Sequence, residues 1–215
     1  MLYPPLEVRH LVLNQLPLFP LGSVLYPGSV LPLRIFEVRY LDLIRRCIEA
    51  GAPFGVVSLT RGNEVAKPGQ AETFAQVGTL ALIKEHESPQ PGLRVVRCLG
   101  TQRFRIQRSE RLKHGLWVAD VAYLPEDSVV ALPAELQDCA TLLQSALARM
   151  PAEVQSNLFE DTPSAAQLQD CSWLANRWCQ LLPLPLEMKQ RLLELDSPLI
   201  RLELVSDLLD KLQLR

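Results

Sequence analysis

The feature that most constrains the fold is a change in the spacing of apolar residues near Pro125. Before Pro125, short runs rich in β-branched and aromatic residues are separated by turn-forming residues, a pattern typical of β-strands. After it, apolar residues recur every three or four positions, as they do on one face of an α-helix. The chain is therefore predicted to contain a strand-rich part, residues 1–125, followed by a helical part, residues 126–215.

The strand-rich part contains six predicted strands and one early helix. Within Arg103–Gln107, Phe104 and Ile106 share one face and the arginines share the other. Helical spacing over Glu37–Ala50 is followed by Gly51 at the position of a C-terminal cap. Many short strands with one helix indicate a small, partly closed β-barrel. The predicted strands are Leu16–Phe19, Phe54–Leu59, Val77–Lys84, Leu93–Leu99, Arg103–Gln107 and Trp117–Tyr123.

The helical part contains about four predicted amphipathic helices. Ser164 and Gln167 match a capping box, which predicts a helix start. Because every helix has an apolar stripe, the helices are expected to pack on one another or on the barrel, which gives an α+β fold. The predicted helices are Glu135–Met150, one from Ser164 to Trp178, one starting at Pro185 and one starting at Ser197-Pro198.

The charge distribution separates the same two parts of the chain. Residues 1–125 hold 15 Lys and Arg against 10 Asp and Glu, whereas residues 126–215 hold 7 against 14. The formal net charge of −2 therefore conceals a basic half and an acidic half. The opposite charges of the two halves favour docking of one half on the other. The near-neutral total charge gives no overall indication of nucleic-acid binding. With 48% hydrophobic residues, the chain has enough apolar material for a globular core.

An uncharged stretch from Leu11 to Leu33 is long enough to cross a bilayer as a helix, but its composition opposes that structure. It contains four prolines and two glycines, which leave backbone groups that lipid cannot satisfy. No basic region precedes it and no small-residue cleavage site follows it, so a secretory signal is not expected. The five cysteines include no CxxC pair and are predicted to be buried reduced thiols. We therefore expect a cytoplasmic protein without a membrane span.

The most specific signal is an ordered series of short motifs. They are LPLFPL at 16–21, VLYPG at 24–28, LPLRIFEVRY at 31–40, FGVV at 54–57, VGTLA at 77–81, GTQRFRI at 100–106, YLP at 123–125, LLPL at 181–184 and KQRLLE at 189–194. This series resembles the N-terminal domain of Lon-type ATP-dependent proteases, with Tyr26 where phenylalanine is commoner in the family. Since the resemblance covers nearly the whole chain in order, it is far more specific than a single short motif.

The resemblance implies both a fold and a function. In that family the domain has a PUA-like, β-rich subdomain followed by helices, and it helps to recognise protein substrates. Residues 1–125 and 126–215 are accordingly expected to form these two subdomains of one unit. The ATPase of the full-length proteases needs a GxxxxGK[ST] loop, and no glycine in this sequence is followed by lysine. We therefore expect a stand-alone, non-catalytic recognition or adaptor module that uses no cofactor.

The expected partners are unfolded or extended polypeptide segments, or a partner protein, bound in a groove between barrel and helices. A homodimer is also permitted by the leucine-rich helices. No membrane partner is expected. The expected binding residues are Phe36, Glu37, Arg39, Tyr40, Arg103 and Arg105.

Most of the signature consists of apolar residues, Pro and Gly, so it mainly specifies the fold. Pro27-Gly28 is predicted to form a type II turn, because proline sets the first angle and glycine accepts the positive one. Glu37 suits the positive N-terminal end of the predicted helix. Arg39 lies about 200° around a helix from Glu37, so no local pair between them is expected.

RNA binding is the alternative function, and it rests on a basic stripe from Arg94 to Lys113. Seven Lys and Arg residues in this stripe accompany a single Glu, and PUA-like barrels also occur in RNA-binding proteins. The stacking aromatics of RNA platforms are absent apart from Phe104, which the alternation turns inward. A solvated arginine face, or one docked on the acidic half, is the competing interpretation.

Catalytic and metal-binding sites are not expected. His10, His86 and His114 lack the spacing of metal ligands, and none is paired with a cysteine as a nucleophile and base would be.

Overall fold

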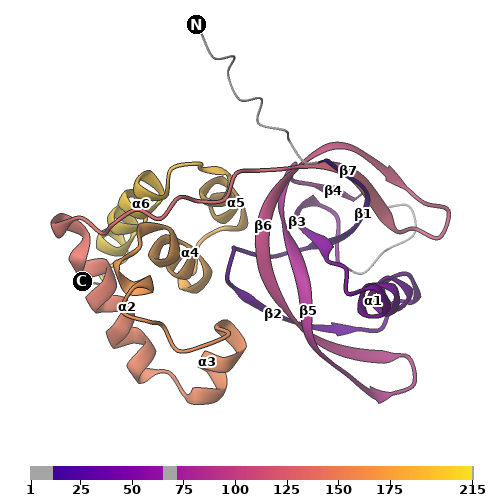
Figure 1. Cartoon of the computed structure of the whole chain (residues 1–215), viewed down its shortest axis with the longest axis horizontal. Helices are drawn as coiled ribbons and strands as arrows, with labels where there is room; N and C mark the ends of the chain where they lie inside the picture. Colours follow the sequence, from indigo (N-terminus) through magenta and orange to yellow (C-terminus); the bar gives the residue numbers. More distant parts are fainter. Residues whose placement is uncertain (1–11, 65–71, 215) are drawn as a thin grey trace, which may run out of the picture.

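The computed structural model describes residues 12–64 and 72–214, which form two lobes side by side (Figure 1). One lobe contains the seven strands of the described residues and α1, the other contains the remaining helices, and residues 124–133 connect them. The α+β class is thereby confirmed. The strands are β1 (Val12–Leu21), β2 (Val30–Ile35), β3 (Phe54–Arg61), β4 (Thr73–Phe74), β5 (Val77–Gln90), β6 (Leu93–Arg111) and β7 (Trp117–Tyr123).

Five of the strands close into a barrel. Their pairing order is β1-β7-β6-β5-β3, and β3 pairs in turn with β1, which completes the ring. The β1–β3 pair is parallel, whereas the other pairs around the ring are antiparallel. Two strands were not among those predicted: β2, which pairs with β6 outside this ring, and β4, a short strand on β3.

Strand β6 changes its neighbour along its length. Its first part pairs with β2 and its last part pairs with β7. Between these parts β6 has one extra residue, because its segment Gly100–Arg103 lies opposite the shorter segment Thr79–Ala81 of β5. Such a β-bulge bends the strand and redirects its side chains. The prediction of two separate strands, Leu93–Leu99 and Arg103–Gln107, was therefore wrong, since one strand runs through the bulge.

Helix α1 (Val38–Ala50) packs against the barrel with an apolar face. The ring of Tyr40 stacks on Phe19 of β1, with 3.9 Å between the ring centres. The helix ends at Gly51, whose φ of 60° is the left-handed conformation that the C-terminal cap requires. The predicted helix is confirmed except at its first residue, because the backbone of Glu37 is still extended.

The helical lobe contains five α-helices within the described residues, one more than the predicted number. Helix α3 is the additional one. The elements are η1 (Ala134–Leu136), α2 (Gln137–Arg149), α3 (Ala152–Leu158), η2 (Gln167–Gln169), α4 (Cys171–Leu181), α5 (Leu186–Glu194) and α6 (Pro198–Lys211), of which η1 and η2 are single 3-10 turns.

The helix predicted from Ser164 is divided in two at Asp170. Ser164 and Gln167 do exchange the hydrogen bonds of a capping box, but the element that follows is only the single 3-10 turn η2 and not an α-helix. At Asp170 the backbone is extended, with φ −113°, and its carboxylate accepts hydrogen bonds from two N–H groups in the first turn of α4. Asp170 therefore starts α4 as a separate helix.

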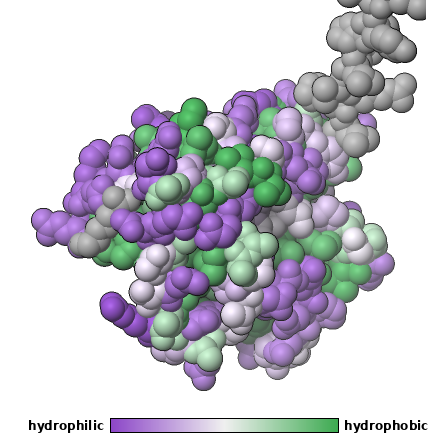
Figure 2. All heavy atoms as spheres, turned by 60° about the vertical axis from the view of Figure 1, so that its left-hand side comes forward, coloured by the Kyte–Doolittle hydropathy of each residue, from purple (hydrophilic) through white to green (hydrophobic). Residues whose placement is uncertain are grey.

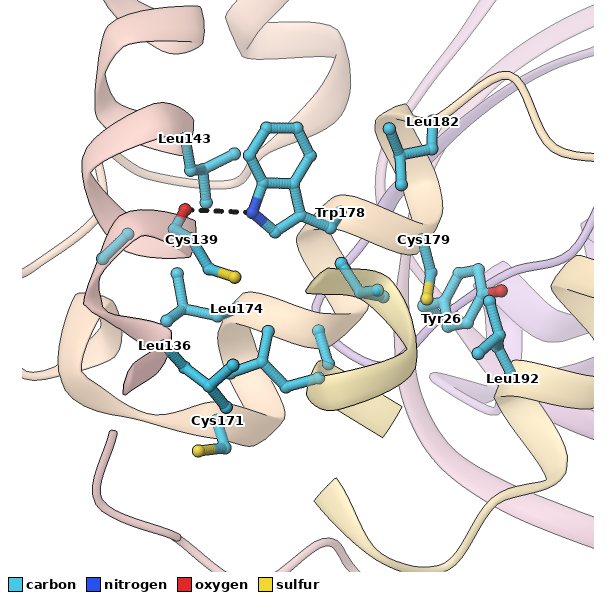
Figure 3. Packing of buried hydrophobic residues seen from close by; sticks show 14 of the residues in the cluster. Tyr26, Leu136, Cys139, Leu143, Cys171, Leu174, Trp178, Cys179, Leu182 and Leu192 are labelled. Carbon is cyan, nitrogen blue, oxygen red and sulfur yellow. Dashed lines mark hydrogen bonds between the residues drawn. The ribbon is translucent and has the colours of Figure 1, made fainter. Parts of the chain in front are cut away.

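The core of the helical lobe includes one residue from the segment between β1 and β2. Trp178 donates its indole N–H to the carbonyl oxygen of Cys139 at 3.0 Å, which joins α4 to α2 (Figure 3). Tyr26 lies beside Cys179 and Leu192 in the same cluster (Figure 3). Its hydroxyl donates to the carbonyl oxygen of Lys189 at 2.6 Å. The barrel lobe thus contributes to the helical core, which holds the two lobes together.

The five cysteines are buried and form no disulfide. Hydrophilic side chains cover most of the face shown in Figure 2, with apolar ones in separate patches. No helix of the described residues is long and apolar enough to cross a membrane. Within residues 12–64 and 72–214, His, Cys, Asp and Glu side chains form no group of three that could hold a metal ion; His10 lies outside this part.

Candidate functional site

A cleft of about 540 Å³ lies where the two lobes meet. Three segments far apart in the sequence line it: the turn at Pro27-Gly28, the β6 bulge at Gly100–Arg103, and the end of β7 with the connecting segment. Thr101 and Gln102 lie between the last residue that pairs with β2 and the first that pairs with β7, so no strand of the described residues pairs with this edge of β6. The cleft therefore occupies a gap in the sheet beside the helical lobe.

The turn at the cleft has the predicted structure. The N–H of Ser29 donates to the carbonyl oxygen of Tyr26 at 3.0 Å, and Gly28 has the positive φ, 71°, that a type II turn needs. The N–H of Gly28 then donates to the carbonyl oxygen of Gly100 at 2.7 Å. A Cβ on Gly100 would collide with the carbonyl oxygen of Tyr26, so glycine lets the turn lie directly against the bulge.

Asp127, in the connecting segment, joins both lobes through ion pairs beside the cleft. Its carboxylate pairs with Arg103 of β6 at 2.9 Å and with Arg201 of α6, and it accepts a hydrogen bond from Ser172 of α4 at 2.9 Å. Burial alone would raise the pKa of this carboxyl, but the hydrogen bond and charge of Arg201 and the charge of Arg103 outweigh burial and lower it. Asp127 is therefore ionised at neutral pH.

Arg103 extends from the barrel into the helical lobe and is 3% exposed. Its guanidinium donates to the carbonyl oxygens of Leu193 at 2.8 Å and Leu195 at 3.1 Å, in addition to its pair with Asp127. Burial lowers the pKa of Arg103. The interpretation of a solvated arginine face is wrong at this residue, because the helical lobe covers it, whereas Arg105 is exposed.

Arg177 of α4 holds the turn from its other side. Its terminal nitrogens donate to the carbonyl oxygens of Pro27-Gly28, both at 2.6 Å, and to the hydroxyl of Ser29 at 2.9 Å. The guanidinium carbon lies 5.8 Å from the ring centre of Phe159 and 5.7 Å from that of Trp173. Arg177 is 1% exposed, pairs with no carboxylate of the described residues, and has an Nε without a hydrogen-bond partner there. Burial lowers its pKa to about 10.

The basic half and the acidic half also meet away from the cleft. Lys84 of β5 pairs with Glu160 at 3.0 Å. Arg97 of β6 donates to the carbonyl oxygens of Ser156 and Phe159, both at 3.0 Å. Docking of the arginine stripe on the second half is therefore observed for Arg97, as it is for Arg103.

Comparison with known proteins identifies the family. Residues 15–211 match the family model described as the ATP-dependent protease La (LON) substrate-binding domain. The chain belongs to the LON substrate-binding domain family. A solved structure of a Lon N-terminal domain protein from Xanthomonas campestris is 34% identical, with a TM-score of 0.70, and the match covers 91% of this chain and 98% of that one.

Relatives of this LON domain include much longer proteins. A Lon protease of Anaeromyxobacter dehalogenans is 30% identical over 203 residues, which are 91% of this chain and 23% of the relative. Protein cereblon of Danio rerio is 30% identical over 117 residues, which are 53% of this chain and 26% of cereblon. The chain thus spans about a quarter of the length of the curated relatives it matches. The N-terminal domain of a Lon protease from Mycobacterium avium complex shares the fold, with 19% identity, a TM-score of 0.61, and coverage of 90% of this chain and 97% of that one.

Four of the six predicted binding residues lie at the start of α1 of the LON domain, and none of them lines the cleft. Phe36 is 58% exposed, whereas Arg39 and Tyr40 are buried in the barrel lobe. Arg39 Nε donates to the carboxylate of Glu37 at 3.1 Å. The prediction that these two side chains would not pair was wrong, because Glu37 is extended and the helical angle does not apply to it.

Arg39 and Tyr40 hold the barrel together. Arg39 donates to the carbonyl oxygen of Gly115 at 3.0 Å and pairs with the buried Glu72 at 3.5 Å. Glu72 also accepts the indole N–H of Trp117 at 3.0 Å. Both signature residues thus contact other parts of the barrel lobe, and a binding role for them stays a prediction.

Of the other two predicted binding residues, Arg103 lines the cleft and Arg105 does not. Sequence reasoning missed Asp127, Ser172, Arg177 and Arg201. A usable signal existed, because the cleft is lined by parts of the motifs VLYPG, GTQRFRI and YLP, which the LON family resemblance had already singled out.

Proposed function

We propose that this LON substrate-binding domain binds extended or unfolded polypeptide segments in the cleft between its lobes, and that it catalyses no reaction itself. The observation that supports this most is the meeting of three family motifs, about 70 and 20 residues apart along the chain, at one cleft. The matched family is described by substrate binding rather than by catalysis. The five buried free thiols suit a reducing compartment, and we propose the cytoplasm.

The uncovered edge of β6 supports an extended ligand. An extended segment placed along a strand edge forms main-chain hydrogen bonds, and its alternate side chains enter neighbouring pockets. At Thr101 and Gln102 the edge lies between β2 and β7. The adjacent cleft wall has apolar side chains, such as Leu80 and Leu99, as well as polar ones. Binding through the main chain would tolerate many sequences, which suits a recogniser of unfolded chains.

RNA binding receives no comparable support. The stripe does not form one free basic surface, since Arg97 and Arg103 donate to groups of the helical lobe. Polypeptide binding is therefore the one function that we propose.

The test measures binding of a labelled protein that has been reduced and carboxymethylated so that it cannot fold. We expect binding at micromolar concentrations and a loss of at least about tenfold in Gln102→Trp, because the indole would fill the cleft. Gln107→Trp is the matched control, because Gln107 is exposed on the same strand outside the cleft lining. Absence of binding to the unmodified domain, or equal binding by both variants, would contradict the proposal.

A further inference from the structure

A second pocket of about 300 Å³ lies between the lobes, on the other side of the segment that carries Tyr26. Its walls come from residues 22–25 and the start of β2 in the barrel lobe, and from the region between the end of α4 and α5 in the helical lobe. Apolar side chains form much of the lining. They are Val24, Leu25, Val30, Leu31, Leu184 and Leu186.

One cation, Lys189 of α5, lines this pocket. Its ammonium donates to the carbonyl oxygen of Gln180 at 3.1 Å, and its own carbonyl oxygen accepts the hydroxyl of Tyr26. The side chain of Gln180 is held in turn, because it accepts a hydrogen bond from Ser29 at 3.1 Å and donates to the carbonyl oxygen of Leu158 at 3.2 Å. Lys189 is therefore held on both sides by an ordered hydrogen-bond network.

Lys189 has no carboxylate partner among the described residues. The neighbouring acids of α5 are already engaged, Glu187 with Arg191 at 2.6 Å and Glu194 with Gln190 at 2.7 Å. The side chain of Lys189 is half-buried, and burial lowers the pKa of its ammonium. Because a cation in such surroundings is poorly solvated, an anion placed beside it would be bound more strongly than on an open surface.

We infer that this pocket binds the free C-terminus of a polypeptide whose last side chain is apolar. A C-terminal residue carries a carboxylate and a side chain on one Cα, which matches an ammonium next to apolar walls. An internal Asp or Glu presents its charge at the end of its own side chain and leaves the walls unfilled. A single Lys without Arg suits a monoanion better than a phosphate, which Arg clusters recognise. The inference rests on the proposed binding of polypeptides and adds a second contact, at the chain end.

The test compares two short fluorescent peptides that end in Leu-Leu, one with a free carboxylate and one amidated, by fluorescence anisotropy. For the unmodified domain we expect amidation to weaken binding at least about tenfold, because the charge-assisted hydrogen bond to Lys189 is lost. Lys189→Met should lower the affinity for the free-carboxylate peptide to that for the amidated peptide. It should leave the affinity for the amidated peptide unchanged. Lys189→Arg should retain the preference.

Lys113→Met is the matched control, since it removes the same charge from an exposed turn of the barrel lobe and should change neither affinity. Equal binding of the two peptides by the unmodified domain overturns the inference, and this comparison needs no variant to fold. An undiminished preference in Lys189→Met also overturns it. An apolar carboxylate is also carried by a fatty acid, and octanoate tests this alternative as a competitor of the fluorescent peptide. If octanoate competes as strongly as unlabelled peptide, the assignment to a polypeptide end is overturned.

The same measurements separate this inference from the proposed function. Suppose that the unfolded protein binds, that Gln102→Trp weakens this binding, and that amidation has no effect. The proposed binding in the cleft then stands, and the inference of C-terminus binding in the second pocket is wrong. If the peptide with a free carboxylate is preferred and Gln102→Trp has no effect, C-terminus binding in the second pocket is supported and polypeptide binding in the cleft is wrong. If no polypeptide binds, both are wrong.

Discussion

Arg201 and Arg177, both from the helical lobe, are buried at the junction of the lobes, but the structure accommodates their charges differently. Arg201 pairs with the carboxylate of Asp127, which also pairs with Arg103. Arg177 pairs with no carboxylate of the described residues and instead donates to the carbonyl oxygens of the Pro27-Gly28 turn, with the ring centres of Phe159 and Trp173 at 5.8 Å and 5.7 Å from its guanidinium carbon. At the Arg201 site, loss of the carboxylate would leave a buried charge unpaired, so the stability of the domain should depend strongly on it. At the Arg177 site, the acceptors are neutral carbonyl oxygens, so the interaction should stabilise the domain less and mainly position the cleft turn.

The largest expected effect follows from removing the shared carboxylate. Asp127→Asn should lower the free energy of unfolding by about 3–5 kcal/mol, because it removes the buried carboxylate that the guanidinium groups of Arg103 and Arg201 share. Urea unfolding monitored by circular dichroism measures this loss. Asp196→Asn is the matched control, since Asp196 also lies 3.5 Å from Arg103 but is 80% exposed, and it should cost less than about 1 kcal/mol. Equal losses in the two variants would show that burial does not distinguish these pairs.

A smaller effect is expected at the second arginine. Arg177→Met keeps much of the side-chain volume but leaves the turn carbonyl oxygens without donors, so it should cost about 1–3 kcal/mol. The same unfolding experiment measures it, with Arg149→Met, at an exposed position of α2, as the control that changes stability by less than about 0.5 kcal/mol. A loss greater than that of Asp127→Asn would reverse the proposed ranking of the two sites.

The smallest expected effect is a difference in acid sensitivity. The pKa of Asp127 is lowered in the folded protein from about 3.8, so its contribution to stability is fully present above that value. The contribution is lost as the pH falls through the lower folded pKa. The stability difference between the unmodified domain and Asp127→Asn should therefore shrink as the pH falls below about 4, measured by urea unfolding at each pH. The difference for Arg177→Met should stay constant over this range, and a parallel decrease there would contradict the comparison.

Local features of the fold were predictable because their causes are local. Gly28 in its turn and Gly51 at the end of α1 have the positive φ that their neighbours in the sequence indicated. Ser197 caps α6, as the Ser197-Pro198 pair predicted. Helix α3 was missed because none of its residues is buried, so it has no apolar stripe to detect. Strand β2 was missed because Pro32 interrupts the pattern, which only an edge strand tolerates.

The candidate site was less predictable because it is made of distant contacts. Arg103 was chosen as a binding residue, but no sequence pattern indicated that the carbonyl oxygens of Leu193 and Leu195 would cover it. Glu37 and Arg39 were judged by helical geometry, whereas Glu37 lies just outside the helix. The division into subdomains at residues 125 and 126, the homodimer and the six binding residues stay predictions.

The sequence by itself determined the change from strands to helices near Pro125, the turn at Pro27-Gly28 and the family resemblance, because each depends on neighbouring residues or on ordered motifs. Only the tertiary structure decided which charges are buried and where the cleft lies. Asp127 meets Arg201 across 74 positions, and Arg177 meets Gly28 across 149. Burial and charge pairing arise from packing between such distant segments, so a pattern in neighbouring residues cannot specify them.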